Sequence, residues 1–208
     1  MAEKLRLVSK DYWEPKTIIG KMVKSGEITS IEQIAELGKP VLEPEIIDVL
    51  LPGLESETLQ VKTTQRVTDS GKRTQFRVVV VIGDHKCHVG IGVGKSEEMK
   101  PALDSAIRNA KKNMIAIYLG CGSWECKCQV KHSLTQKTIG RGSGTKITLK
   151  PAPRGLGLAA NDVVKKVLTM AGVDDVWSFS SGGKNLYNTA IATIDALDNL
   201  NKLKPQVK

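Results

Sequence analysis

Residues 88–98, HVGIGVGKSEE, contain Gly94, Lys95 and Ser96, the residue types with which phosphate-binding loops hold a nucleotide. Such a loop has the spacing G-x-x-x-x-G-K-[ST], because four intervening residues let the backbone amides curl around a phosphate. The first glycine of that pattern would fall at position 89, which is Val89. The dinucleotide pattern G-x-G-x-x-G fails as well, since the glycines here are spaced by two. A nucleotide hydrolase that uses Lys95 and Ser96 is therefore the less favoured alternative.

A spacing of two is the period of a β-strand, in which alternate side chains point to opposite faces. One face of this strand would carry valine and isoleucine, and the other would carry only glycines: Gly90, Gly92 and Gly94. A face without side chains suits the close approach of another backbone, either protein or nucleic acid. The sequence leaves open which of the two approaches.

Residues 121–132, CGSWECKCQVKH, hold three of the four cysteines. Their pattern, C-x4-C-x-C-x3-H, supplies the ligand types that zinc prefers, although the strongest zinc signatures use pairs of C-x2-C. The alternative is a packed loop with reduced thiols, and a disulfide framework is disfavoured because nothing indicates export. The zinc candidates are Cys121, Cys126, Cys128 and His132; no other cofactor is expected.

Enzyme signatures are missing from the sequence, which shows no catalytic triad, paired acids or nucleophile elbow. We therefore expect a protein that is not an enzyme. The first 16 residues lack the apolar core of a signal peptide, and the longest apolar run, VVVVI at 78–82, is far too short to span a bilayer. A cytoplasmic location is expected.

The net charge of +9 is concentrated in the middle of the chain. Residues 60–154 hold 18 Lys and Arg against 6 Asp and Glu, whereas residues 1–59 hold 7 against 11. Concentrated positive charge is typical of proteins that bind a polyphosphate, while a merely solvated lysine-rich surface would be mixed with acids. Aromatic residues, at 4%, look too scattered to form a base-stacking platform. The pattern favours recognition of RNA phosphates and RNA shape.

Glycine and proline residues mark helix ends and turns, and their positions predict the boundaries of the helices and strands. Residues 1–57 read as short helices that end at Gly26, Gly38 and Pro52, an appendage expected to pack on a partner. Residues 58–94 read as three strands with turns at 69–72 and 83–86, and residues 101–118 read as an amphipathic helix. The helix would carry three cations together on the side opposite its apolar face: Arg108, Lys111 and Lys112.

Three strands followed by a helix resemble a double-stranded-RNA-binding domain, which reads A-form shape and phosphates. Residues 133–208 predict a small α/β two-layer unit, in which PAPRGLGLAAND at 151–162 joins a strand to a helix. The glycines of that segment and Arg154 either hold a phosphate at the helix start or simply connect the two elements. The fold class is therefore α+β: a helical N-terminal extension (1–57), a double-stranded-RNA-binding-like domain (58–120), a Cys-rich connector (121–132) and a C-terminal α/β domain (133–208).

Two segments resemble a known family in the correct order. RVTDSGKRTQFRVVVVIGDHKCHVGIGVGKSEEMKPALDSAIRNAKKNM is similar to the first domain of the universal small-subunit ribosomal protein five family, and KPAPRGLGLAANDVVKKVLTMAGVDDVWS with TAIATIDAL to its second. WEPKT, EPEIIDVLLP and CGSWECKC resemble the archaeal branch. The bacterial pattern lacks the cysteine cluster and most of the N-terminal extension.

The resemblance implies a structural constituent of the small ribosomal subunit that binds its rRNA near the neck and the messenger entry channel. It further implies ribosomal proteins four and eight as neighbours, a contribution to subunit assembly, and a role in translational accuracy through the contact with protein four. Together with the charge pattern, it predicts RNA contacts for a set of cationic residues: Lys62, Arg66, Lys72, Arg73, Arg77, Lys95, Arg108, Lys111, Lys112, Arg141, Lys146 and Arg154.

Overall fold

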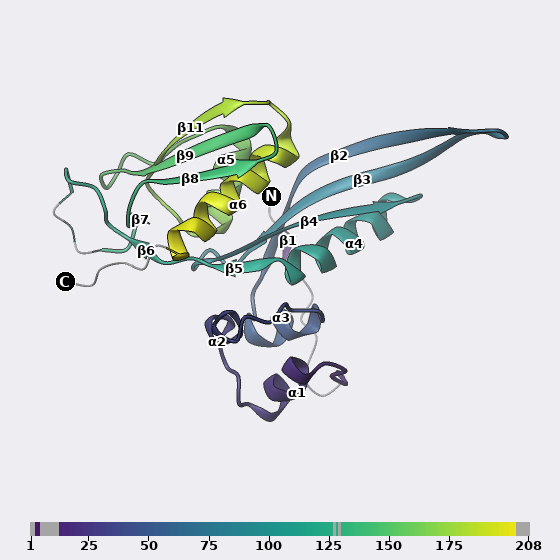
Figure 1. Ribbon diagram of the computed structural model, residues 1–208, viewed down its shortest axis with the longest axis horizontal. Coiled ribbons are helices and arrows are strands. Elements are labelled where there is room, and N and C mark those ends of the chain that lie inside the picture. The colour runs from purple at the N-terminus through teal and green to yellow at the C-terminus, as the bar shows by residue number, and fades with distance from the viewer. Residues whose placement is uncertain (1–2, 5–12, 127, 129, 203–208) are drawn as a thin grey trace. The chain divides into compact units, whose positions relative to one another are not determined.

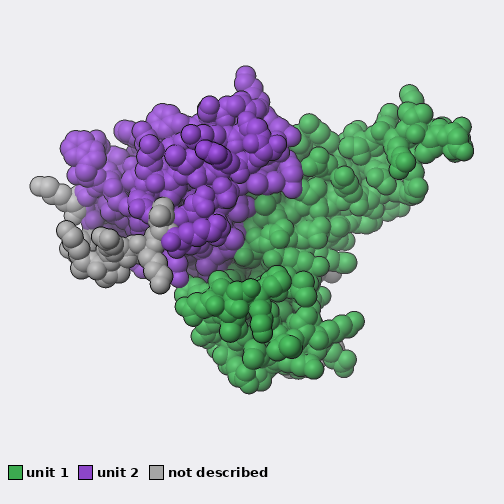
Figure 2. All heavy atoms as spheres, viewed as in Figure 1, with its two compact units in different colours: residues 1–82, 90–114 green, residues 83–89, 115–208 purple. Residues whose placement is uncertain are grey.

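The computed structural model describes residues 3–4, 13–126, 128 and 130–202 of this α+β chain. Parts of the expected N-terminal extension, connector and C-terminal domain therefore lie outside the described residues. The chain forms two compact units, one of residues 1–82 and 90–114 and the other of residues 83–89 and 115–208 (Figure 2). Each unit has its own sheet and helices (Figure 1).

The first unit opens with three short helices, α1 (Ile18–Ser25), α2 (Ile31–Glu36) and α3 (Glu45–Leu50). The Thr17 side chain caps α1 by accepting a hydrogen bond from the Gly20 amide, and α1 ends at Gly26, whose φ of 86° lies in the left-handed region. Apolar side chains of these helices and of the segments beside them form a cluster of their own: Trp13, Ile19, Val23, Ile28, Ile34 and Ile46.

These helices also contribute to the main core of the first unit. Ile31, Ile47 and Leu54 are buried in one cluster with Val78 of the sheet and Ala106 of the following helix. The expectation that this segment is an appendage packing on a partner is therefore wrong for α2 and α3, which pack within their own unit.

A five-stranded sheet, most of whose residues belong to this unit, has the order β1-β2-β3-β4-β5. Its strands are β1 (Glu3–Lys4), β2 (Glu55–Thr68), β3 (Gly71–Gly83), β4 (His88–Ser96) and β5 (Met114–Ala116). In β3 the run from Val78 to Ile82 is buried, whereas residues 71–74 and all of 61–68 are exposed. The outer halves of β2 and β3 thus form an arm without a core, which runs on to a narrow tip (Figure 1). We call residues 61–74 the hairpin arm.

Helix α4 (Met99–Lys112) covers the glycine face of β4. A Cβ added at Gly92 would lie 2.1 Å from the Ala106 carbonyl oxygen, and one at Gly94 would lie 2.0 Å from that of Ala102. The bare strand face therefore exists to admit the backbone of α4. This settles the alternative left open above in favour of protein, so the glycines themselves are not an RNA surface.

The second unit has a four-stranded sheet of order β10-β11-β9-β8. Its strands are β8 (Thr138–Gly142), β9 (Thr145–Pro151), β10 (Leu158–Ala159) and β11 (Val176–Gly182), with β10 parallel to β11 and the other pairs antiparallel. The short strands β6 (Leu119–Gly120) and β7 (Ser133–Leu134) form a separate pair.

Helices α5 (Asp162–Met170) and α6 (Leu186–Lys202) complete the two-layer unit. Glycine again permits close packing, because a Cβ at Gly140 of β8 would lie 2.0 Å from the Ala192 carbonyl oxygen of α6. The turn between β3 and β4 belongs to this unit as well: the His85 amide donates to the Met170 carbonyl at 3.1 Å, and His85 Nδ1 lies 2.8 Å from the Thr169 carbonyl. None of the helices in the described part of the chain combines the length and apolar character that a bilayer span requires.

Candidate nucleic-acid interface and thiol cluster

The hairpin arm presents four exposed cations: Lys62, Arg66, Lys72 and Arg73. An open hollow of about 210 Å³ lies along the arm, lined by Thr64, Gln65, Arg66, Arg73 and Gln75. Arg73 Nε donates to Glu97 Oε1 at 2.8 Å, but both side chains are well exposed, at 66% and 59%. Solvent-exposed pairs of this kind contribute little to stability, so Arg73 stays available to another anion.

Arg77 does not lie at the tip of the hairpin, where the sequence pattern predicts it. It is half-buried in β3, next to the buried Val78. Lys95, in contrast, is exposed at the end of β4, while the adjacent Gly94 is buried against α4. Because residues 88–96 form a strand whose glycine face is filled by α4, they do not curl around a phosphate as a nucleotide loop does.

The cations of α4 divide into two kinds. Arg108 and Lys112 are exposed, but Lys111 is buried, and its Nζ lies 2.6 Å from Oδ1 of Asp48 in α3. Burial raises the pKa of Asp48 above its ordinary 3.8, even though the hydrogen bond and charge of Lys111 lower it. The expectation that Lys111 lies on the far side with the other two, facing RNA, is therefore wrong: its ammonium is sequestered inside the first unit.

The second unit presents a cationic sheet face away from its helices. Arg141 and Lys146 are paired across β8 and β9, and Lys150 Nζ lies 4.9 Å above the Phe179 ring. Phe179 and Trp177 are both exposed on β11. Rings with cations beside them on an open sheet are the features that stack bases in RNA-binding modules. The low content of aromatic residues along the chain does not reveal this pair. The sequence signal for it is VWSFS at 176–180, in which Trp177 and Phe179 are two residues apart.

The loop at 152–157 carries Arg154, whose side chain is exposed. The amides of Gly155 and Gly157 donate to Asp175 Oδ1, at 3.1 and 2.7 Å. They are therefore engaged by a carboxylate of the same unit, and the possibility that these glycines hold a phosphate is wrong. What remains at this loop is the Arg154 side chain itself.

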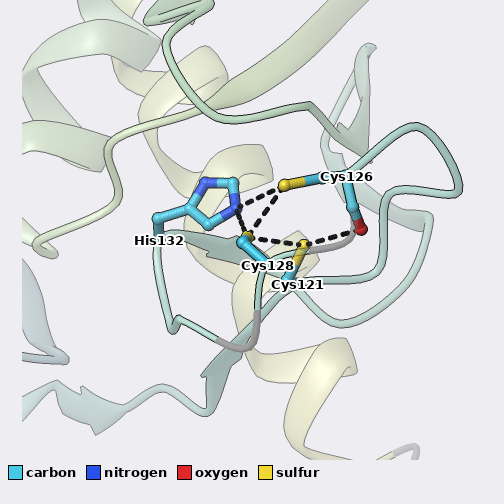
Figure 3. A group of neighbouring side chains, drawn as sticks. All are labelled: Cys121, Cys126, Cys128 and His132. Atoms are coloured by element: carbon cyan, nitrogen blue, oxygen red, sulfur yellow. Dashed lines mark hydrogen bonds between the residues drawn. The ribbon is translucent and has the colours of Figure 1, made fainter.

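The four zinc candidates do lie together, with their ligand atoms all within 4.8 Å of one another (Figure 3). Cys128 is central: its Sγ lies 2.8 Å from that of Cys126, 3.5 Å from that of Cys121 and 3.1 Å from His132 Nε2. His132 is buried, and its Nδ1 lies 2.8 Å from Asp175 Oδ2. Three sulfurs and one imidazole nitrogen are a donor set that zinc accepts.

Two thiols of the cluster have shifted acidities. Hydrogen bonds from the Cys128 side chain and from the backbone amide of Arg154 lower the pKa of Cys126 to about 6. Burial raises the pKa of Cys121 to about 11, and its bonding to Cys128 adds to the effect. The fourth cysteine, Cys87, lies outside the cluster.

Comparison with known proteins gives consistent matches over most of the chain. Residues 54–118 match the family described as ribosomal protein S5, N-terminal domain, and residues 140–208 match ribosomal protein S5, C-terminal domain. The chain is 50% identical over 192 residues to small ribosomal subunit protein uS5 of Methanocaldococcus jannaschii, covering 92% of this chain and 88% of that protein. It is 47% identical over 193 residues to the protein of the same name from Aeropyrum pernix, with the same coverage of each chain. Both relatives are archaeal.

Proposed function

The chain belongs to the ribosomal protein S5 family, in its archaeal form, and from this membership we propose that it is a structural component of the small ribosomal subunit in the cytoplasm. Relatives of this name are structural ribosomal proteins rather than enzymes, and the chain is not an enzyme. Its task is to bind small-subunit rRNA and hold it in place.

The observation that carries the proposal is the hairpin arm, which has cations and no core. The strands of residues 61–68 and 71–74 contribute no buried residue to a core, so packing within the unit does not explain them. Arg66 and Arg73 both line the hollow on this arm. A protruding strand pair with closely spaced cations matches a partner with regularly spaced phosphates, which bind through release of counterions.

The finer parts of the proposal follow from the family. The module of β2, β3, β4 and α4 has the order of a double-stranded-RNA-binding-like domain, preceded by a helical N-terminal extension, and would read A-form shape. The rRNA contact would lie near the neck and the messenger entry channel. Ribosomal proteins four and eight would be neighbours, with roles in subunit assembly and, through protein four, in accuracy. Of the predicted RNA-facing residues, eleven stay in the proposal and Lys111 leaves it, because it is buried.

The test reverses two charges near the tip of the arm, Arg66→Glu together with Lys72→Glu. Binding to small-subunit rRNA is measured by filter binding across a series of salt concentrations. We expect weaker binding and a salt slope reduced by about 1 for each phosphate that the variant no longer neutralises. The matched control reverses Lys21 and Lys39, which are exposed on the N-terminal helices and linkers of the same unit.

Equal weakening in the arm variant and the control would indicate that net charge alone decides binding, against a role for the arm. Co-sedimentation gives a second measurement: the tagged chain should migrate with the small subunit in a stoichiometric ratio after a high-salt wash. A chain found only in the free fraction would contradict the ribosomal assignment.

A further inference from the structure

We propose that Cys121, Cys126, Cys128 and His132 bind one Zn²⁺ ion, and that the bound ion fixes the loop at 152–157 which presents Arg154. The metal site stands on geometry alone. The consequence for RNA rests on the proposed function.

The ligand atoms already have nearly the spacing of a tetrahedral site. Two sulfurs at about 2.3 Å from a tetrahedral zinc ion are roughly 3.7 Å apart, and a sulfur and an imidazole nitrogen are slightly closer. The Cys121–Cys128 sulfur distance is 3.5 Å, and the His132 Nε2 distances to Cys128 and Cys126 are 3.1 and 3.8 Å. The Cys126 and Cys128 sulfurs, at 2.8 Å, must separate to admit the ion, and no two of the ligand atoms are more than 4.8 Å apart.

His132 is oriented as a zinc ligand. A carboxylate only accepts hydrogen bonds, so the contact with Asp175 Oδ2 places the proton on His132 Nδ1 and leaves the lone pair of Nε2 directed at the sulfurs. Both side chains of this pair are at least 95% buried. A carboxylate behind a histidine is the usual outer partner of a zinc site, where it fixes the tautomer and the ring orientation.

The segment that carries the cysteines lacks a core of its own. Among its described residues from Cys121 to Lys131, none is buried, and Trp124 is 90% exposed. Apolar packing therefore does not hold three thiols together here. A structural zinc ion supplies the missing folding free energy in such segments, and its binding releases the thiol protons to solvent without any redox change.

The cluster is joined to the 152–157 loop through Asp175. Asp175 bridges His132, through Oδ2, and the amides of Gly155 and Gly157, through Oδ1. An ion that fixes His132 therefore also fixes Asp175, and with it the two amides that follow Arg154 in the loop.

Zinc uptake is tested on the full chain. Purified protein should contain one zinc per chain by elemental analysis and native mass spectrometry. Replacement by Co²⁺ should give thiolate-to-cobalt charge transfer and the visible bands of a tetrahedral site. Cys128→Ser should abolish both signals, while Cys87→Ser, outside the cluster, should keep them. Wild-type chain that takes up no stoichiometric metal, or in which Cys126 and Cys128 form a disulfide instead, would overturn the site.

The link through Asp175 has its own variant. Asp175→Asn should weaken zinc binding by about 10- to 100-fold, the range seen when the outer partner of a ligand is changed. Asp174→Asn is the control, because Asp174 is the exposed neighbour. Equal zinc affinity in the two variants would sink the assigned role of Asp175.

The loop is tested by hydrogen exchange at the amides of Gly155 and Gly157 in zinc-loaded and chelated protein. We expect faster exchange at both amides after chelation. Unchanged rates would overturn the proposal that the bound ion fixes the loop. Zinc uptake without RNA binding would refute the proposed function and leave the site intact. RNA binding without zinc uptake would refute the site alone.

Discussion

Lys111 and Arg73 each face a carboxylate in the first unit, but their surroundings differ. The Lys111–Asp48 pair is 9% and 6% exposed, whereas the Arg73–Glu97 pair is mostly in solvent. An exposed pair is screened and is worth little, so Arg73 can exchange its partner for a phosphate. A buried pair that loses one member leaves an uncompensated charge, so Lys111 is committed to the fold.

Replacing Lys111 with Met tests this commitment. The variant leaves Asp48 buried without its cation, and we expect a loss of about 3–5 kcal/mol in the free energy of unfolding at neutral pH. Urea unfolding followed by circular dichroism measures it. Lys112→Met, at the exposed neighbouring position, is the control and should change little.

The same variant has a predicted pH dependence. Burial already raises the pKa of Asp48 in the folded protein, and removing Lys111 raises it further. A folded-state pKa above the unfolded value gives stability that is lost as pH rises through it. The loss of unfolding free energy in the Lys111→Met variant should therefore become smaller as pH falls from neutral toward 3.8, the ordinary pKa of an aspartate. A deficit independent of pH would show that Asp48 is not its origin.

The sequence contains a signal for the buried position of Lys111. Leu103, Ile107 and Lys111 follow one another at intervals of four, which places the lysine on the apolar side of the helix. Its charge led to the opposite prediction. What the sequence does not contain is the partner, because Asp48 lies 63 residues away on another helix.

At the scale of elements, both sheets pack in the same way. In each, a strand with glycines on one face lies against a helix with alanines on the facing side. Gly92 and Gly94 of β4 face Ala102 and Ala106 of α4, and Gly140 of β8 faces Ala192 and Ala196 of α6. The sequence predicts the bare face from the spacing of two but not what covers it. The signal for the cover is the series Ala102, Ala106 and Ala110 at intervals of four, the helical counterpart of the glycine alternation.

Gly92→Ala tests the close packing. Its new Cβ would lie 2.1 Å from a carbonyl oxygen and 2.3 Å from the Ala110 amide nitrogen, so strand or helix must shift. We expect a loss of about 3 kcal/mol, at the upper end for overpacking, seen as a lower midpoint of thermal unfolding. Gly144→Ala is the control, because a Cβ there meets nothing within 4 Å. Equal stability of the two variants would mean that α4 adapts without cost.

At the scale of the whole molecule, exposed cations occur in both units. The hairpin arm belongs to the first unit, and Arg141, Lys146 and Arg154 belong to the second. The sequence predicted this excess of charge from composition alone, since charge needs no knowledge of the fold. The sequence did not show which cations are exposed and which are buried. It also did not show that Trp177 and Phe179 lie on one sheet face.

If both units contact one RNA, their contributions to affinity should add. We expect Arg141→Glu with Lys146→Glu to weaken rRNA binding, and the combination with Arg66→Glu and Lys72→Glu to show the sum of the two changes in log Kd. The measurement is filter binding at several salt concentrations. Lys165→Glu, on an exposed site of α5, is the control for the second unit. A combined change no larger than that of the arm alone would confine the contact to the first unit.

The turn between β3 and β4 has a consequence for biosynthesis. His85 lies in a turn whose hydrogen-bond partner, Thr169, comes 84 residues later in the chain. A ribosome adding about 5–20 residues per second takes roughly 4 to 17 s to reach that partner. During this interval the turn of the nascent chain lacks its hydrogen bonds to Met170 and Thr169, so these contacts form only after the carboxyl-terminal half has been translated.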